Sequence, residues 1–208
     1  VQRFHPLHAT QSGFLFCFVG LLIFSSVLPI RFTKPDINLH VIRTLCGYSA
    51  VTAMFTAAAI IPVSDATAIS FLNPVFAMIF ALPLLGEKIG KLRWTSALIG
   101  LLGAFVLLRP SASAFEPAAL LALIAAVVMG LEFILIKILS TNEQDLQILL
   151  INNVLGLLFS SISLLFVWHS PTLIQWIALS GIGFLMLGAQ VCNLIALRGA
   201  ADSIVLPF

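Results

Sequence analysis

The sequence predicts an all-α membrane protein that crosses the bilayer several times. Only 9% of its 208 residues are charged and 61% are hydrophobic, whereas roughly a quarter of a soluble domain is charged. The mean hydropathy is +1.15. A water-soluble chain would have to cover this apolar excess with polar surface that the sequence lacks. We therefore expect a polytopic protein surrounded by a lipid bilayer.

Seven apolar segments have about the length that a helix needs to cross the hydrocarbon core, roughly 20 residues. The expected spans are residues 13–30, 41–61, 66–85, 94–108, 117–139, 148–168 and 173–197, with an eighth beginning near Ser203. The span 94–108 is short, and we expect the flanking Arg93 and Arg109 to snorkel. The chain begins at Val1 and stops at Phe208 inside apolar sequence. We expect it to be a fragment.

Basic residues favour one side of the predicted membrane. If successive loops alternate sides, the smaller group of basic residues comprises Arg3 and Arg109. The larger group is Arg31, Lys34, Arg43, Lys88, Lys91, Arg93, Lys137 and Arg198. Cytoplasmic loops carry the excess of Lys and Arg. The side with Lys88, Lys91 and Arg93 is therefore predicted to be cytoplasmic, and Val1 external.

The span 66–85 contains the pair Asn73-Pro74, and Pro83 follows near its end. Proline removes a hydrogen bond from a helix, so we expect the helix to break at both places. Inside a membrane, the freed carbonyls must be satisfied by protein or by water in a cavity. Asn73 and Pro74 are therefore candidates for the wall of a solute pathway, with a packing kink as the alternative.

Glu132 is the acidic residue that lies well inside a predicted span. Burying a charged side chain at this depth costs about 3 kcal/mol on insertion scales, so the carboxyl must be protonated, paired or in contact with a wet cavity. One interpretation is a group that carries a proton or contacts a solute. The other is a neutral structural carboxyl that is hydrogen-bonded to a second helix.

Further polar side chains lie in the predicted spans. Amides offer both donors and acceptors to an uncharged or zwitterionic solute, but they also connect helices to one another. The candidates are Asn152, Asn153, Gln190 and Asn193. Arg43 and Tyr48, at the cytoplasmic start of the span 41–61, are candidates for contact with an anionic group, although an arginine at a helix end also serves topology.

Short sequence matches recur about 135 residues apart, as in an internal repeat. The matched pairs are residues 20–26 with 156–161, Gly47 with Gly181, and Pro74 with Pro207. Five predicted spans separate matched elements, so the second copy is inverted relative to the first. Inverted repeats are a transporter architecture, with the solute site at the midplane between the halves.

The residues from Arg43 to Pro110 resemble the EamA-type branch of the drug/metabolite transporter superfamily. The resemblance is carried by Ala66-Thr-Ala-Ile-Ser-Phe-Leu-Asn-Pro74, Leu85-Gly-Glu87, Arg93-Trp94 and Gly100-Leu-Leu-Gly-Ala-Phe-Val-Leu-Leu-Arg-Pro110. It implies ten helices in two inverted five-helix repeats. Residues 1–110 would be the first repeat without its first helix, and residues 111–208 the second repeat, truncated after the start of its fourth helix.

We therefore expect a secondary active transporter of the bacterial inner membrane. It would move a small metabolite or amphiphilic solute by alternating access, coupled to protons or to exchange, without a cofactor. The alternatives are an intramembrane enzyme, for which the sequence has no zinc or nucleophile motif, and a membrane scaffold. Neither a nucleic-acid partner nor a metal site is indicated. A homodimer is also open.

Overall fold

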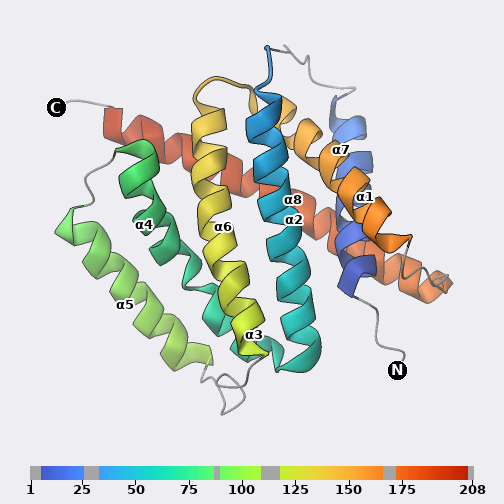
Figure 1. Cartoon of the computed structure of the whole chain (residues 1–208), viewed down its shortest axis with the longest axis horizontal. Coiled ribbons are helices and arrows are strands. Elements are labelled where there is room, and N and C mark those ends of the chain that lie inside the picture. Colours follow the sequence, from blue (N-terminus) through green and yellow to red (C-terminus); the bar gives the residue numbers. More distant parts are fainter. Residues whose placement is uncertain (1–5, 26–32, 87–89, 109–117, 166–171, 206–208) are drawn as a thin grey trace. The chain divides into compact units, whose positions relative to one another are not determined.

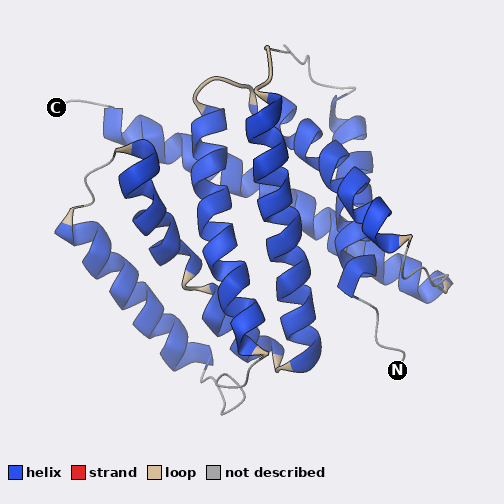
Figure 2. Ribbon diagram, viewed as in Figure 1, coloured by secondary structure: helices blue, strands red, loops and turns tan. Residues whose placement is uncertain are grey.

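The computed structural model describes residues 6–25, 33–86, 90–108, 118–165 and 172–205. These residues form helices and the turns between them, with no strand among them (Figure 1; Figure 2). The helices are α1 (Pro6–Ser25), α2 (Ile37–Ile60), α3 (Val63–Ser70), α4 (Asn73–Leu85), α5 (Lys91–Leu108), α6 (Ala119–Ser140), α7 (Asp145–Leu164) and α8 (Leu173–Val205). Val1 and Lys88, which enter the predicted orientation, and Pro207, which enters the predicted repeat, lie outside the described residues.

Six segments of the described chain are long and apolar enough to cross a membrane. They are Pro6–Ile23, Ile37–Ile60, Val63–Leu85, Ala119–Ser140, Asp145–Leu164 and Leu173–Cys192. They coincide with six of the seven expected spans and confirm the polytopic all-α class. The remaining expected span, 94–108, lies within α5, which is not among the six.

The chain divides into two compact units. Unit 1 consists of Val1–Pro6 and Cys46–Leu135, and unit 2 of Leu7–Leu45 and Ile136–Phe208. Each unit has its own buried apolar core and its own polar contacts.

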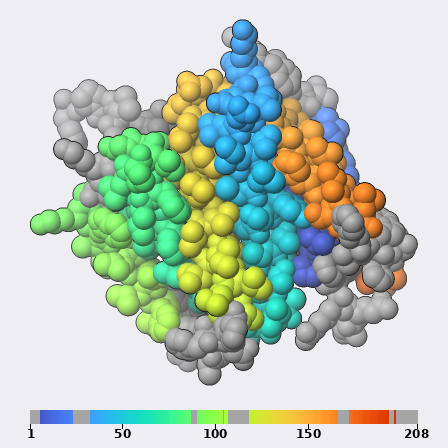
Figure 3. Space-filling view, in the orientation of Figure 1, coloured from blue at the N-terminus to red at the C-terminus, as the bar shows by residue number. Residues whose placement is uncertain are grey.

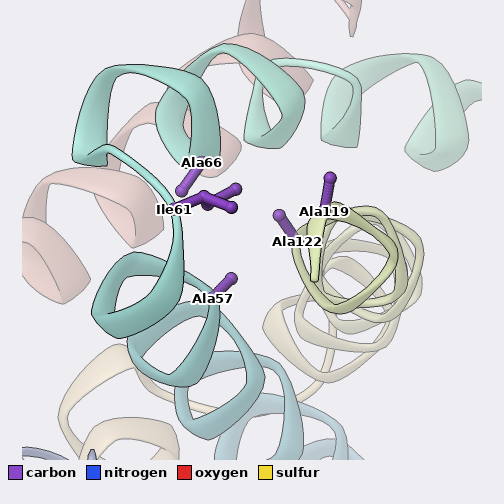
Figure 4. Close-up of a cluster of buried hydrophobic side chains, with 5 residues drawn as sticks. All are labelled: Ala57, Ile61, Ala66, Ala119 and Ala122. Atoms are coloured by element: carbon purple, nitrogen blue, oxygen red, sulfur yellow. The ribbon is translucent and has the colours of Figure 1, made fainter. Parts of the chain in front are cut away.

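Small side chains build the core of unit 1 where α2, α3 and α6 meet. The α2 helix ends at Ile60, and the carbonyl of Pro62 then accepts the first hydrogen bonds of α3. Figure 4 shows the buried cluster at this corner: Ala57, Ile61, Ala66, Ala119 and Ala122. Four of its five members are alanines, which let helix backbones approach closely.

The break between α3 and α4 lies where the sequence predicts it. The α3 helix ends at Ser70 and α4 begins at Asn73. The carbonyl of Leu72 accepts hydrogen bonds from the backbone N–H groups of Val75 and Phe76, at 3.0 and 3.1 Å, so the helix restarts there. The expected break at Pro83 is absent: α4 continues through Pro83 to Leu85 and ends at Gly86, whose φ of 65° is left-handed. Pro83 removes the bond to the carbonyl four residues before it, but α4 ends two residues later, so no further turn depends on that bond.

Glycines bring α1 and α8 close together in unit 2. A Cβ added at Gly13 would lie 2.5 Å from Met186 Sδ, and one at Gly20 would lie 2.5 Å from Leu187 Cδ2. Leu21, Ile136 and Leu149 form a buried apolar cluster in this unit. The α8 helix continues to Val205 without the loop expected before Ser203, because no proline interrupts it within its described residues.

Candidate functional site

The Glu132 carboxylate lies directly against the backbone of α2 in unit 1. A Cβ added at Gly47 would lie 2.7 Å from Glu132 Oε1 and 3.2 Å from Oε2. Real Cβ atoms do not approach an oxygen to 2.7 Å, so the carboxylate occupies space that only a glycine at position 47 leaves. Glu132 is half-buried in α6, well inside a segment that is apolar enough to span a membrane.

Gly130 brings the other side of α6 against the broken helix. A Cβ there would lie 2.7 Å from Phe76 Cβ, 2.8 Å from the Ala77 backbone nitrogen and 3.0 Å from the Asn73 carbonyl oxygen. In Figure 3 the atoms of α4 and α6 lie side by side. The first turn of α4, directly after the break, is therefore in backbone contact with α6.

Glu132 and the Asn73-Pro74 break do not lie on the same face of α6. Residues 130 and 132 are two positions apart, which turns their side chains by roughly 200° about the helix axis. Glu132 therefore points to α2 while Gly130 points to α4. Asn73 is half-buried and Pro74 is exposed. We call Glu132, Gly47 and the backbone around them the Glu132 site. The α3–α4 break is a separate feature on the opposite side of α6.

Tyr48 and Arg43 differ from each other in their surroundings. Tyr48 is half-buried and follows Gly47, so its side chain points about 100° away from the Glu132 contact. Arg43 belongs to unit 2 and is only 3% exposed. The sequence offers two interpretations of Arg43, contact with an anionic group and a helix-end residue that sets the topology. An arginine that only set the topology would be exposed, whereas Arg43 is buried.

Three of the four predicted amides make contacts between helices of unit 2. Asn152 Oδ1 accepts a hydrogen bond from Thr44 Oγ1 at 3.2 Å, which joins α7 to α2. Asn153 Nδ2 donates to Gln190 Oε1 at 3.0 Å and to the Leu149 carbonyl at 2.8 Å, which joins α7 to α8. The structure does not describe the side chain of Asn193. The amides thus fit the interpretation of interhelical contacts.

A buried polar cluster that the sequence does not predict lies where α2 and α7 begin. His40 Nε2 lies 2.8 Å from Glu143 Oε2, and Gln147 Nε2 donates to the same oxygen at 2.7 Å. His40 and Glu143 lie 103 positions apart, and both fall outside the expected spans. The available signal was the spacing of Glu143 and Gln147, two polar side chains four residues apart where α7 begins.

A solved structure resembles this chain in fold, and curated proteins resemble it in sequence. One solved crystal structure superposes with a TM-score of 0.72 over 93% of this chain and 71% of the other, at 19% identity. The S-adenosylmethionine uptake transporter of Rickettsia bellii is 27% identical over 83% of this chain and 60% of its own length. The riboflavin transporter of Vibrio cholerae is 29% identical over 81% of this chain and 57% of its own length.

An exporter is also among the relatives. The pseudopaline exporter CntI of Pseudomonas aeruginosa is 25% identical over 78% of this chain and 58% of its own length. The chain thus spans less than two thirds of each of these relatives. Its residues 1–109 match the EamA-like transporter family, which is more than half of the sequence. The chain belongs to the EamA-like transporter family.

Proposed function

We propose that the protein is a secondary active transporter that moves a small organic solute across the bacterial inner membrane by alternating access. The observation that carries this proposal is the Glu132 site, in which a carboxylate within a membrane-spanning helix lies against a glycine of the neighbouring helix. A carboxylate at this depth is costly, and such residues mark solute or ion pathways. Glu132 would bind a proton, the solute, or each in turn.

A glycine, which has no side chain, faces the carboxylate across the Glu132 site. Gly47 offers no side chain opposite the carboxylate, so water or a solute group can approach Glu132 once α2 and α6 separate. The α3–α4 break gives the other side of α6 a helix end that can move without bending a continuous helix. These features support transport rather than a chemical reaction, and we infer that the protein is not an enzyme and needs no cofactor.

The repeats and the charged loops complete the proposal. Residues 1–110 and 111–208 would form the two inverted repeats, with the side that carries Lys91 and Arg93 in the cytoplasm. The named relatives suggest two solutes to try first, S-adenosylmethionine and riboflavin. Both are small organic metabolites, and relatives named for uptake and for export support measuring flux in both directions.

Reconstituted liposomes test the proposal. The full-length protein is expected to accumulate radiolabelled S-adenosylmethionine or riboflavin above the external concentration when a pH gradient is imposed, and to lose this accumulation when a protonophore collapses the gradient. Uptake into vesicles that are preloaded with the same solute tests the alternative, in which transport is coupled to exchange. Flux equal to that of protein-free liposomes in every arm, for these solutes and a wider metabolite panel, would contradict transport.

Gly47→Ala probes the contact with the carboxylate. The new methyl group would displace Glu132 Oε1, which is the far end of a flexible side chain, so we expect the helices to keep their places. The gain in helix propensity, about 1 kcal/mol from Gly to Ala, offsets part of the strain. We therefore expect a thermal midpoint in detergent close to that of the wild type and a clearly lower initial rate of uptake.

The matched control for Gly47→Ala is Gly181→Ala. A Cβ at Gly181 meets nothing within 4 Å among the described residues, so this variant is expected to transport like the wild type. Equal rates for the two variants would show that the space beside Glu132 plays no part in transport.

A further inference from the structure

A buried ionisable pair lies at the end of unit 2 where α2 and α7 begin. His40 Nε2 is 2.8 Å from Glu143 Oε2. His40 is 0% exposed and Glu143 is 6% exposed. Acidic side chains are almost never fully buried unless they are paired. The pair belongs to unit 2, whereas the Glu132 site belongs to unit 1, and the proposed function does not use the pair.

Three donors from three places in the chain converge on Glu143. Its Oε1 accepts the backbone N–H of Asp36 at 3.1 Å, and its Oε2 accepts Gln147 Nε2 at 2.7 Å as well as the His40 ring. An ionised carboxylate is an acceptor only and can satisfy all three donors. A protonated carboxyl would present an O–H group to one of them, so the arrangement fits the ionised form.

Gln147 extends this cluster to residues 33–36, the segment directly before α2. Its Oε1 accepts the Thr33 backbone N–H at 2.8 Å and the Thr33 hydroxyl at 3.3 Å. Glu143 and Gln147 therefore hold both ends of this segment against the start of α7. Residues 33–36 are themselves exposed, so water reaches the outer side of the contact.

The His40 ring has one nitrogen left for a proton. Because the Glu143 carboxylate only accepts, Nε2 must carry the hydrogen, and in the neutral ring Nδ1 is then an acceptor. Nδ1 is buried and has no hydrogen-bond partner among the described residues. Histidine is the side chain whose charge ordinarily changes between about pH 5 and pH 8.

We propose that His40 and Glu143 form a proton-binding site that controls how firmly residues 33–36 are held. A hydronium ion transfers a proton to the lone pair of His40 Nδ1: an N–H bond forms, an O–H bond of the hydronium breaks, water is released, and the formal charge of the pair changes from −1 to zero. The Nε2–H group then donates as part of an imidazolium, so the attraction between opposite charges adds to the hydrogen bond that the carboxylate already accepts. Protonation therefore tightens the contact, and deprotonation loosens it.

Other charged groups lie on the same segments and near the end of α6. They are Lys34 and Asp36 before α2, Arg43 on α2, Lys137 on α6 and Asp145 on α7. This step rests on the proposed function: during the transport cycle, the bound proton would keep residues 33–36 held against the start of α7. Lys34 and Lys137 place this end on the side that we propose to be cytoplasmic.

Hydrogen–deuterium exchange of the full-length protein in lipid nanodiscs tests the site without any solute. After correction for the intrinsic pH dependence of exchange, we expect the amides of residues 33–40 to exchange severalfold more slowly at about pH 5.5 than at pH 8, the range in which histidine titrates. His40→Gln keeps an N–H donor for Glu143 but cannot titrate, so its corrected exchange should be the same at both pH values.

His8→Gln is the matched control, because His8 is another buried histidine of unit 2. It should keep the pH difference of the wild type. A His40→Gln variant with that same difference, or a wild type with none, would overturn the proposal. Hydrogen–deuterium exchange rates equal to those of the wild type in peptides from α3 and α4 verify that each variant is folded. Since the assay contains no solute, its failure leaves the proposed transport untouched, and a failure of transport leaves this result untouched.

Discussion

Glu132→Gln is expected to reduce solute accumulation in liposomes to the level of protein-free vesicles when a pH gradient drives it. Glutamine keeps the size and the hydrogen-bonding capacity of the side chain beside Gly47 but cannot release or bind a proton. If the carboxyl carries the coupled proton, the pH dependence of uptake disappears along with accumulation. The measurement is the initial rate of uptake at a series of external pH values.

The same substitution separates the two interpretations of Glu132. A neutral structural carboxyl would be replaced by glutamine with little loss, and both the rate and the pH profile would then remain those of the wild type. Asn142→Ala serves as the control, because Asn142 is exposed in the turn between α6 and α7. Exchange of solute for solute, without a gradient, should survive in Glu132→Gln if Glu132 serves coupling alone.

Gly130→Ala is expected to destabilise unit 1 by about 1–3 kcal/mol, the usual cost of forcing an extra methyl group into a packed site. The methyl group would meet the Ala77 backbone nitrogen at 2.8 Å and the Asn73 carbonyl oxygen at 3.0 Å. Backbone atoms cannot rotate away as a side chain can, so α6 and the first turn of α4 must separate. The measurement is the thermal midpoint in detergent.

Gly100→Ala makes the identical chemical change in α5, where an added Cβ meets nothing within 4 Å among the described residues. Its helix propensity improves by up to about 1 kcal/mol, so its midpoint should stay the same or rise. A lower thermal midpoint for Gly130→Ala and a higher one for Gly100→Ala would identify packing against the broken helix as the cause of the destabilisation. If Gly130→Ala were as stable as Gly100→Ala, the close approach of α4 and α6 would be wrong.

The sequence predicts the parts of this fold that depend on local chemistry. Apolar length identifies the spans, and the missing donor of Pro74 identifies the break before α4. Pro83 carries the same chemical signal and does not break its helix, because it lies only two residues before the end at Leu85. The effect of a proline thus depends on where the helix ends, and that is decided here by the left-handed Gly86.

Contacts between distant residues could not be predicted in the same way. Nothing local to Glu132 shows that its neighbour is Gly47, and nothing local to His40 shows that Glu143 lies 103 residues further along the chain at 2.8 Å. The sequence predicts Arg43 at the end of a span, yet packing within the chain leaves it 3% exposed. Such pairings follow from helix packing, which hydropathy alone does not specify.

Solute protection of Glu132 from a hydrophobic carbodiimide tests most directly whether this carboxyl lies on the transport pathway. The reagent modifies protonated carboxyls in apolar surroundings, and peptide mass spectrometry of one digest reports Glu132 together with Asp145, which lies at the start of α7 and serves as the internal reference. We expect Glu132 to be modified, and the transported solute to reduce that modification severalfold while leaving Asp145 unchanged. A Glu132 that is not modified, or whose modification is indifferent to the solute, would contradict its place on the pathway.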